Sequence, residues 1–320
     1  MNKELKKVVI SSTIVLVTLL SIDIIVGLSC DYITRNLPIA DGGQLAKQNY
    51  RLNHVSADMV IIGSSRASHH YIPKVLEDSL KTIKRQEWEV YNAGIDGKYI
   101  SSSCFTIKSI LDRYTPHTIV LEVNDNELLD PDVSDVRFAT PHYTSNKVVK
   151  DYINRIGVKE QVLCMSGMYR YNGGKLFRLL RTMVSSSGIS DIQGYEPLYK
   201  KLQHNDTSES ITTQTKQKAD PYHTNNFVNL LKRCQAENIN LVVVSSPRFR
   251  PNDTNGIVRA YCKEYSTPYV DLYNIPLFNQ RPEWFQDESH LNDVGAKVFT
   301  VMFFNKIRDL KVLEYENSDR

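Results

Sequence analysis

Closely spaced cysteines are missing from this chain of 320 residues. No C-x-x-C spacing occurs, so the sequence gives no indication of a zinc site. An odd number of cysteines argues against a complete disulfide framework, and it leaves room for one bridge that the sequence does not assign. The five cysteines are Cys30, Cys104, Cys164, Cys234 and Cys262.

Excess charge of either sign is also missing. The 39 lysines and arginines nearly balance the 36 acidic residues, and the net charge is +3 with histidine neutral. No tract rich in lysine or arginine stands out, so we expect no nucleic-acid partner. Internal repeats are absent as well. A hydrophobic share of 41% with 23% charged residues is ordinary for a globular chain, and the length suits one large α/β domain or two small ones.

The N-terminus, by contrast, is strongly apolar. Val8 to Leu28 is a run of 21 residues whose only charge is Asp23. At 1.5 Å per residue, such a helix crosses a hydrocarbon core of roughly 30 Å. Lys3, Lys6 and Lys7 precede the run, and the positive-inside rule then puts the N-terminus in the cytoplasm. We therefore predict one transmembrane helix in the lipid bilayer of the cell inner membrane, with the remaining chain periplasmic or extracellular.

Other interpretations of this segment stay open. A cleaved signal peptide is less favoured, because no A-x-A site follows. Gly27-Leu28-Ser29-Cys30 loosely resembles a lipoprotein cleavage box, with glycine where that box prefers leucine. Asp23 lies toward the outer end of the run, where a charge costs less than at the bilayer centre. It is either tolerated at the interface or marks a contact with a membrane-protein partner.

From residue 58 the pattern alternates between strands and helices. We predict an anchor over residues 1–29, a tether with a short helix over 30–57, and one α/β domain over 58–312. Strands alternating with helices indicate right-handed crossovers and a parallel sheet, here a flavodoxin-like three-layer α/β/α fold with five strands. The predicted strands are Met59–Ile62, Glu89–Tyr91, Thr118–Val123, Asn240–Ser245 and Tyr269–Leu272. The predicted helices lie at about 73–86, 99–113, 225–237, 255–265 and 293–310.

The stretch from about 130 to 220 interrupts this rhythm. A helical pattern runs near 146–183, with Leu176, Leu179 and Leu180 at helical spacing. A polar tract follows near 204–219. We predict a helical insertion between the third and fourth strands, which could cap a site at the sheet edge.

Two motifs follow strands where an open parallel sheet gathers its functional residues. Gly63-Ser64-Ser65 comes directly after the first strand, and Asp287-Glu288-Ser289-His290 follows the fifth strand and a loop. Ser65 offers a nucleophilic hydroxyl, His290 a general base, and Asp287 a carboxylate that orients the base. Each also has a plain structural interpretation, since serine is a favoured helix N-cap and aspartate often caps loops.

The order of these motifs resembles the SGNH (GDSL-type) hydrolase superfamily. Gly63-Ser64-Ser65 is similar to its first block, with Ser64 in place of aspartate, and Asn92 to Gly97 is similar to the second. Asp287 to Gly295 is similar to the last block. The resemblance covers about residues 58–128 and 240–310.

The resemblance implies Ser65 as nucleophile, with Asp287 and His290 completing a triad. It implies that Gly97 gives a backbone N–H to the oxyanion hole, and it implies no metal and no cofactor. The third block departs from the family pattern. Counting from the strand favours Asn126 as the oxyanion-hole amide, whereas the literal Asn-Asp pair favours Asn124.

Several assignments remain alternatives. Ser64 is a second candidate nucleophile, and His69 with His70 suggests a metal site that lacks close acidic partners in the sequence. The leading hypothesis is a membrane-anchored serine esterase or O-acyltransferase. Its substrate would be an acyl ester, such as acetyl, of a cell-envelope carbohydrate or polysaccharide. The main alternative is a catalytically degenerate module that binds glycan or a membrane partner, and a structural subunit of an envelope complex is the third.

Overall fold

The computed structural model of the protein describes residues 3–36, 43–84, 87–97, 100–184, 193–203, 219–251 and 255–314. The chain divides into two compact units. The helical unit comprises Met1–Asn49 and Val136–Gly188, and the sheet unit comprises Tyr50–Asp135 and Ile189–Arg320. Most of the polar tract predicted near 204–219 lies outside the described residues.

A five-stranded parallel sheet forms the centre of the sheet unit, in the order β2-β1-β3-β4-β5. This is the flavodoxin-like order, so the predicted α/β fold class is confirmed. The three central strands are buried along their whole length, which explains why most of their residues are Val, Ile and Leu. The strands are β1 Met59–Ile62, β2 Val90–Asn92, β3 Thr118–Glu122, β4 Leu241–Ser245 and β5 Tyr269–Asp271.

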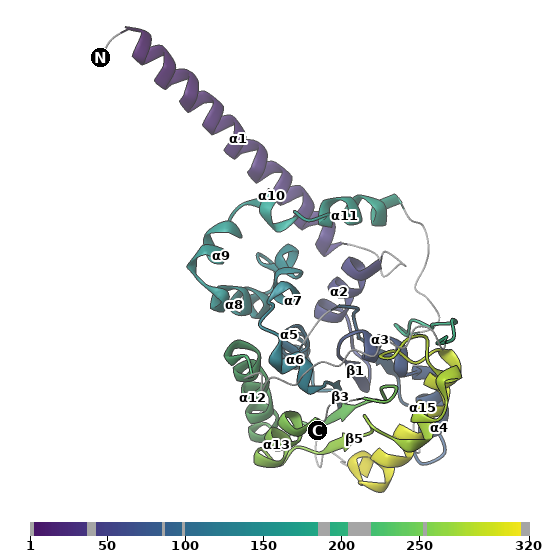
Figure 1. Ribbon diagram of the computed structural model, residues 1–320. Helices are drawn as coiled ribbons and strands as arrows, with labels where there is room; N and C mark the ends of the chain where they lie inside the picture. The colour runs from purple at the N-terminus through teal and green to yellow at the C-terminus, as the bar shows by residue number, and fades with distance from the viewer. Residues whose placement is uncertain are drawn as a thin grey trace. The chain divides into compact units, whose positions relative to one another are not determined.

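Helices cover both faces of this sheet (Figure 1). On one face α15 packs against α3 and α4, and its Phe299 and Phe303 join the sheet residues in the main apolar core. On the other face α5 packs against α12. The α-helices of the unit are α3 Ser65–His70, α4 Pro73–Leu80, α5 Ile100–Leu111, α6 Asp125–Leu129, α12 Pro221–Ala236, α13 Gly256–Glu264, α14 Pro276–Asn279 and α15 Asp293–Asp309. Its 3₁₀ helices are η3 Pro282–Trp284 and η4 Val312–Glu314.

The helical unit contains most of the predicted insertion. The run expected near 146–183 is divided into four helices by three breaks. Gly157 adopts a φ of +150°, Ser166 begins a new helix as its N-cap, and Gly173 and Gly174 adopt φ values of +62° and +82°. These helices are α8 Lys147–Ile156, α9 Val158–Leu163, α10 Gly167–Arg170 and α11 Lys175–Val184, preceded by η1 Thr140–His142. Two further helices contain the sequence positions at which one unit ends and the other begins. They are α2 Gly43–Asn53 and α7 Ser134–Arg137.

The N-terminal helix α1 spans Lys3–Arg35, a length of 33 residues. It is the one helix among the described residues that is long and apolar enough to cross a membrane. Its most apolar window has no buried residues. Length and composition therefore fit a single-pass anchor or a signal sequence.

Candidate active site

The turn after β1 presents two neighbouring serines at the carboxyl edge of the sheet. Ser64 occupies the N-cap of α3 in an extended conformation, and its side chain makes no capping hydrogen bond. Ser65 is the first residue of the helix, so it is not the N-cap. The local fold thus places the Ser65 hydroxyl where a parallel sheet gathers functional groups.

Three of the predicted site residues meet here. The Oγ atom of Ser65 lies 2.7 Å from Nε2 of His290. On the other side of that ring, Nδ1 lies 2.9 Å from both carboxylate oxygens of Asp287. Residues 225 positions apart in the sequence therefore form a serine–histidine–aspartate chain of hydrogen bonds.

Asp287 is held as a carboxylate by its own turn. Its Oδ1 accepts the backbone N–H groups of Ser289 at 2.8 Å and His290 at 3.0 Å. Burial raises the pKa of Asp287, but the hydrogen bond to the His290 ring and these two N–H groups outweigh it, and the pKa lies below its ordinary value. A charged Asp287 fixes the proton of His290 on Nδ1 and leaves Nε2 to accept the proton of Ser65.

A buried cluster of charged and polar side chains begins at Arg66, the residue after Ser65, and consists of Arg66, His70, Tyr71, Glu122 and Ser246. Nη2 of Arg66 lies 2.9 Å from Oε1 of Glu122, and both side chains are almost fully buried. The Glu122 carboxylate also accepts the Tyr71 hydroxyl, the Ser246 N–H at 3.0 Å and the Ser246 hydroxyl at 2.9 Å. The cluster joins α3, the end of β3 and the residue after β4.

His70 connects this cluster to the loop that carries the candidate base. Its Nε2 accepts the backbone N–H of Leu291 at 2.9 Å, so its proton lies on Nδ1, which donates to Ser246 Oγ at 2.7 Å. Burial and the nearby charge of Arg66 keep the pKa of His70 well below its usual value, so the ring is neutral. Because Leu291 directly follows His290, this bond helps to fix the position of the His290 ring.

Sequence reasoning missed this supporting role. The sequence suggested His70 only as a possible metal ligand. One signal was available, since Ser246 follows β4 just as the predicted site residues follow their own strands. The charge of Glu122, the last residue of the otherwise uncharged strand β3, was a second.

The predicted second block runs alongside the nucleophile turn. Ile95 donates its N–H to the Gly63 carbonyl at 3.1 Å. Gly94 approaches α3 so closely that a Cβ atom there would lie 2.3 Å from the Ser68 nitrogen. The candidate oxyanion residue Gly97 lies in the following turn with a φ of +61°.

Asp96 ties this second block to the site. Its carboxylate lies 3.1 Å from Nε2 of His69, and the His69 ring stands edge-on to the His290 ring with centroids 5.6 Å apart. Burial lowers the pKa of His69, but the hydrogen bond and charge of Asp96 raise it by more. The pKa of His69 therefore lies above its ordinary value. The turn that contains Gly97 is thus anchored beside the candidate base.

The third block places its two asparagines differently. Asn124 is the buried N-cap of α6; its Oδ1 accepts the Asn126 N–H at 3.0 Å, and its Nδ2 donates to Glu127 Oε1 at 3.4 Å. Ser64 donates its hydroxyl to the same oxygen at 3.2 Å. Asn126 itself is exposed on α6. Asn124 and Ser64, the residue before Ser65, therefore share a hydrogen-bond acceptor on Glu127. The oxyanion role of Asn124 or Asn126 stays a prediction.

One group of potential metal ligands occurs among the described residues. The ligand atoms of His69, Asp96 and Glu196 all lie within 4.8 Å of one another. Both ring nitrogens of His69 have protein partners, since Nδ1 lies 2.6 Å from the Glu196 carbonyl oxygen and Nε2 faces Asp96. Hydrogen bonds of the His69 ring therefore account for the closeness of these three residues. That the site needs no metal and no cofactor stays a prediction.

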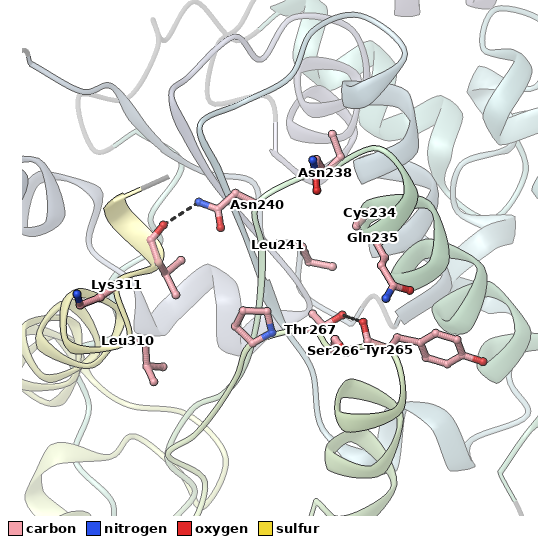
Figure 2. Close-up of a pocket in the computed structure, with 13 residues that line it drawn as sticks. Cys234, Gln235, Asn238, Asn240, Leu241, Tyr265, Ser266, Thr267, Leu310 and Lys311 are labelled. Atoms are coloured by element: carbon pink, nitrogen blue, oxygen red, sulfur yellow. Dashed lines mark hydrogen bonds between the residues drawn. The ribbon is translucent and has the colours of Figure 1, made fainter. Parts of the chain in front are cut away.

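A separate pocket of about 340 Å³ lies at the opposite edge of the sheet (Figure 2). Its lining includes Asn240 and Leu241, where β4 begins, and Pro268, directly before β5. Asn240 Nδ2 closes one side by donating to the Val312 carbonyl at 3.0 Å. Because Ser65 follows the carboxyl end of its strand, this pocket is not part of the triad site.

Comparison with known proteins adds little to this geometry. No family model matches the chain, and no curated protein matches its sequence. Among solved structures, the chain is similar to the crystal structure of the lipase/acylhydrolase from Enterococcus faecalis, with 11% identity and a TM-score of 0.39. The match covers 79% of this chain and 96% of that one. A likeness of this degree assigns no activity.

Glu127 should make the stability of the protein depend on pH. Burial and the charge of Glu122 raise its pKa from 4.5 to about 8, and its Oε2 has no hydrogen-bond partner among the described residues. The folded state thus holds a proton that the unfolded chain releases near pH 4.5. This contribution to stability is complete below that pH and is lost as the pH rises through about 8.

We expect Glu127→Gln to remove this dependence of the free energy of unfolding on pH. At about 1.4 kcal/mol per pKa unit, the free energy of unfolding should shift in favour of the variant by several kcal/mol between pH 5 and pH 8.5. Urea unfolding of the full chain in detergent at both pH values measures this shift. Glu264→Gln, at an exposed site, is the matched control. Equal pH dependence in the wild type and Glu127→Gln would contradict the assignment.

Proposed function

We propose that this protein is a membrane-anchored serine esterase or O-acyltransferase of the SGNH type. Its substrate would be an acyl ester, such as acetyl, of a cell-envelope carbohydrate. One observation carries the proposal, namely the hydrogen-bond chain from Ser65 Oγ through His290 to Asp287. The proposed organisation is an anchor over residues 1–29, a tether over 30–57 and a catalytic domain over 58–312.

The reaction would proceed in two steps. In the first, His290 Nε2 takes the proton of Ser65 as Oγ attacks the acyl carbonyl carbon, and Asp287 stabilises the imidazolium. His290 then gives this proton to the leaving alcohol oxygen, which leaves an acyl group on Ser65. In the second step, His290 deprotonates water or a sugar hydroxyl, whose oxygen attacks the acyl carbonyl carbon. The bond to Ser65 Oγ breaks, and His290 returns the proton to Oγ, which restores the serine hydroxyl and the neutral base.

Charge that develops on the carbonyl oxygen needs hydrogen-bond donors. The backbone N–H groups of Ser65 and Gly97 and the side-chain amide of Asn124 or Asn126 are the proposed donors. Each donor of this kind contributes roughly 2.7–4 kcal/mol to stabilising the transition state. The contacts that hold the Gly97 turn against α3 support its inclusion.

The setting follows from the predicted topology. With the N-terminus cytoplasmic, α1 would hold the catalytic domain on the periplasmic or extracellular side, where envelope carbohydrates occur. A membrane-protein partner and a glycan acceptor are both compatible with that location. The extent to which water is excluded from the site would decide between hydrolysis and transfer.

The test is turnover of acyl esters by the full chain in detergent. We expect release of short acyl groups from activated esters and from acetylated oligosaccharides. Mass spectrometry with a sugar hydroxyl in excess distinguishes acyl transfer from hydrolysis. Binding of glycan without turnover of any ester would instead support a catalytically degenerate binding module.

A further inference from the structure

The C-terminal part of α1 is built into the helical unit. Asp23, the one charge in the apolar run, accepts hydrogen bonds from Ser166 Oγ at 2.8 Å, Gly167 N at 3.1 Å and Met168 N at 2.8 Å. These bonds satisfy its carboxylate and cap the start of α10. Neither interpretation of Asp23 offered by the sequence, interfacial tolerance or an external partner, included this internal contact.

The two backbones touch at a pair of glycines. A Cβ atom on Gly27 would lie 2.8 Å from the Gly167 Cα, and one on Gly167 would lie 2.3 Å from the Gly27 Cα. One helical turn further on, Asp31 pairs with Arg170 at 2.8 Å, and both side chains are buried. Small residues at a helix contact allow this close approach. The depth of α10 relative to α1 is therefore fixed.

The helix before its contact with α10 is too short to cross the bilayer while the helical unit stays outside the lipid. Between Val8 and Ile22 the helix has 15 residues, which span about 22 Å, whereas a hydrocarbon core is roughly 30 Å thick. To span it, the helix must place Asp23 to Leu28 inside the outer boundary of the bilayer. Ser166, Gly167 and Met168 are bonded at that level and must enter the same layer.

The surface beside this contact has the composition of a membrane-facing face. Apolar side chains are 40–77% exposed on and around α10 and α11, which both contact α1 (Figure 1). Two exposed cations on α11, Arg178 and Arg181, are suited to lipid phosphates. The exposed apolar residues are Met165, Met168, Leu176, Phe177 and Leu180.

We propose that this surface is a membrane-docking face, which inserts into the boundary between headgroups and acyl chains of the bilayer that α1 spans. Amphipathic surfaces of this type enter about 5–10 Å into that boundary, which matches the length that α1 lacks. The inference rests on α1 being the anchor and is independent of the catalytic proposal. It assigns the helical insertion a role in holding the protein at the lipid surface.

Spin labels on single introduced cysteines test this face in the full chain, reconstituted in vesicles of phosphatidylcholine and phosphatidylglycerol. The five natural cysteines are buried, and the unsubstituted protein serves as the labelling blank. Met168→Cys and Phe177→Cys probe the face, and Lys150→Cys on α8 is the exposed control within the same unit. Ile14→Cys reports separately on the span.

We expect collision of a water-soluble nickel chelate with the labels at 168 and 177 to be several-fold weaker than at 150, and collision with oxygen to be stronger. If both labels meet the chelate as freely as position 150 while position 14 is in lipid, docking is wrong and the anchor stands. A label at 14 that is exposed to the chelate overturns the anchor and docking together. Ester turnover in the same vesicles tests the catalytic proposal independently.

Discussion

Replacing Ser65 by alanine should lower kcat for ester turnover by about 10⁴- to 10⁶-fold. Its Oγ lies 2.7 Å from His290 Nε2, and that ring is held by a carboxylate whose pKa is depressed. Removing the hydroxyl deletes the covalent step and leaves only the remaining electrostatic stabilisation. Steady-state kinetics of the purified full chain, with circular dichroism to verify folding, measures the loss.

Ser64→Ala is the matched control for this variant. The Ser64 hydroxyl donates to Glu127 at 3.2 Å, so it supports the turn without contacting the candidate base through any described bond. We expect it to retain activity within about tenfold of the wild type, the loss expected for one neutral hydrogen bond. If Ser64→Ala lost activity while Ser65→Ala kept it, the two serines would have to exchange roles.

Arg66→Met should cost about 3–5 kcal/mol of unfolding free energy. The substitution keeps much of the side-chain volume but leaves Glu122 as a fully buried carboxylate without its cation. Arg66 also donates to the Ser246 carbonyl and packs over the Tyr273 ring with 5.0 Å to the centroid. Urea unfolding of the full chain in detergent gives the change in free energy.

An exposed arginine provides the comparison. Arg259 pairs with Asp271, and its side chain is 59% exposed. Arg259→Met should therefore cost less than about 1 kcal/mol, the usual range for a surface pair. Similar losses in both variants would show that burial does not set the importance of the Arg66–Glu122 pair.

The sheet was predictable because a short apolar run in the sequence identifies each of its strands. Met59–Ile62 has the predicted bounds, and the other four strands agree within one residue at each end. Uninterrupted Val, Ile and Leu runs identify strands buried on both faces. Helix ends were harder, since α4 stops at Leu80, although its pattern suggested a continuation to about residue 86.

The site was predictable where spacing alone determines geometry. Asp287 and His290 lie in one turn, and Ser65 follows a strand, so topology brings them to the same edge. Partnerships between distant residues were not predictable. The bonds of His70 to Ser246 and Leu291 join three separate segments of the chain, and no local pattern encodes them.

The internal contact of Asp23 was not predictable for the same reason, because its partners are distant in the sequence. Its three hydrogen bonds reach residues more than 140 positions away, within an insertion whose division into short helices the periodicity did not reveal. A charge in an apolar run is therefore explained only once the tertiary partner is known.

The most direct test is covalent labelling of the full chain with a fluorophosphonate, followed by mapping of the adduct by mass spectrometry. Such a probe reacts with a serine that a general base activates. The proposed mechanism predicts one phosphonyl adduct, on Ser65, that disappears in His290→Ala. An unlabelled wild-type chain, or an adduct that persists without His290, would contradict the assignment of Ser65 and His290 as nucleophile and base.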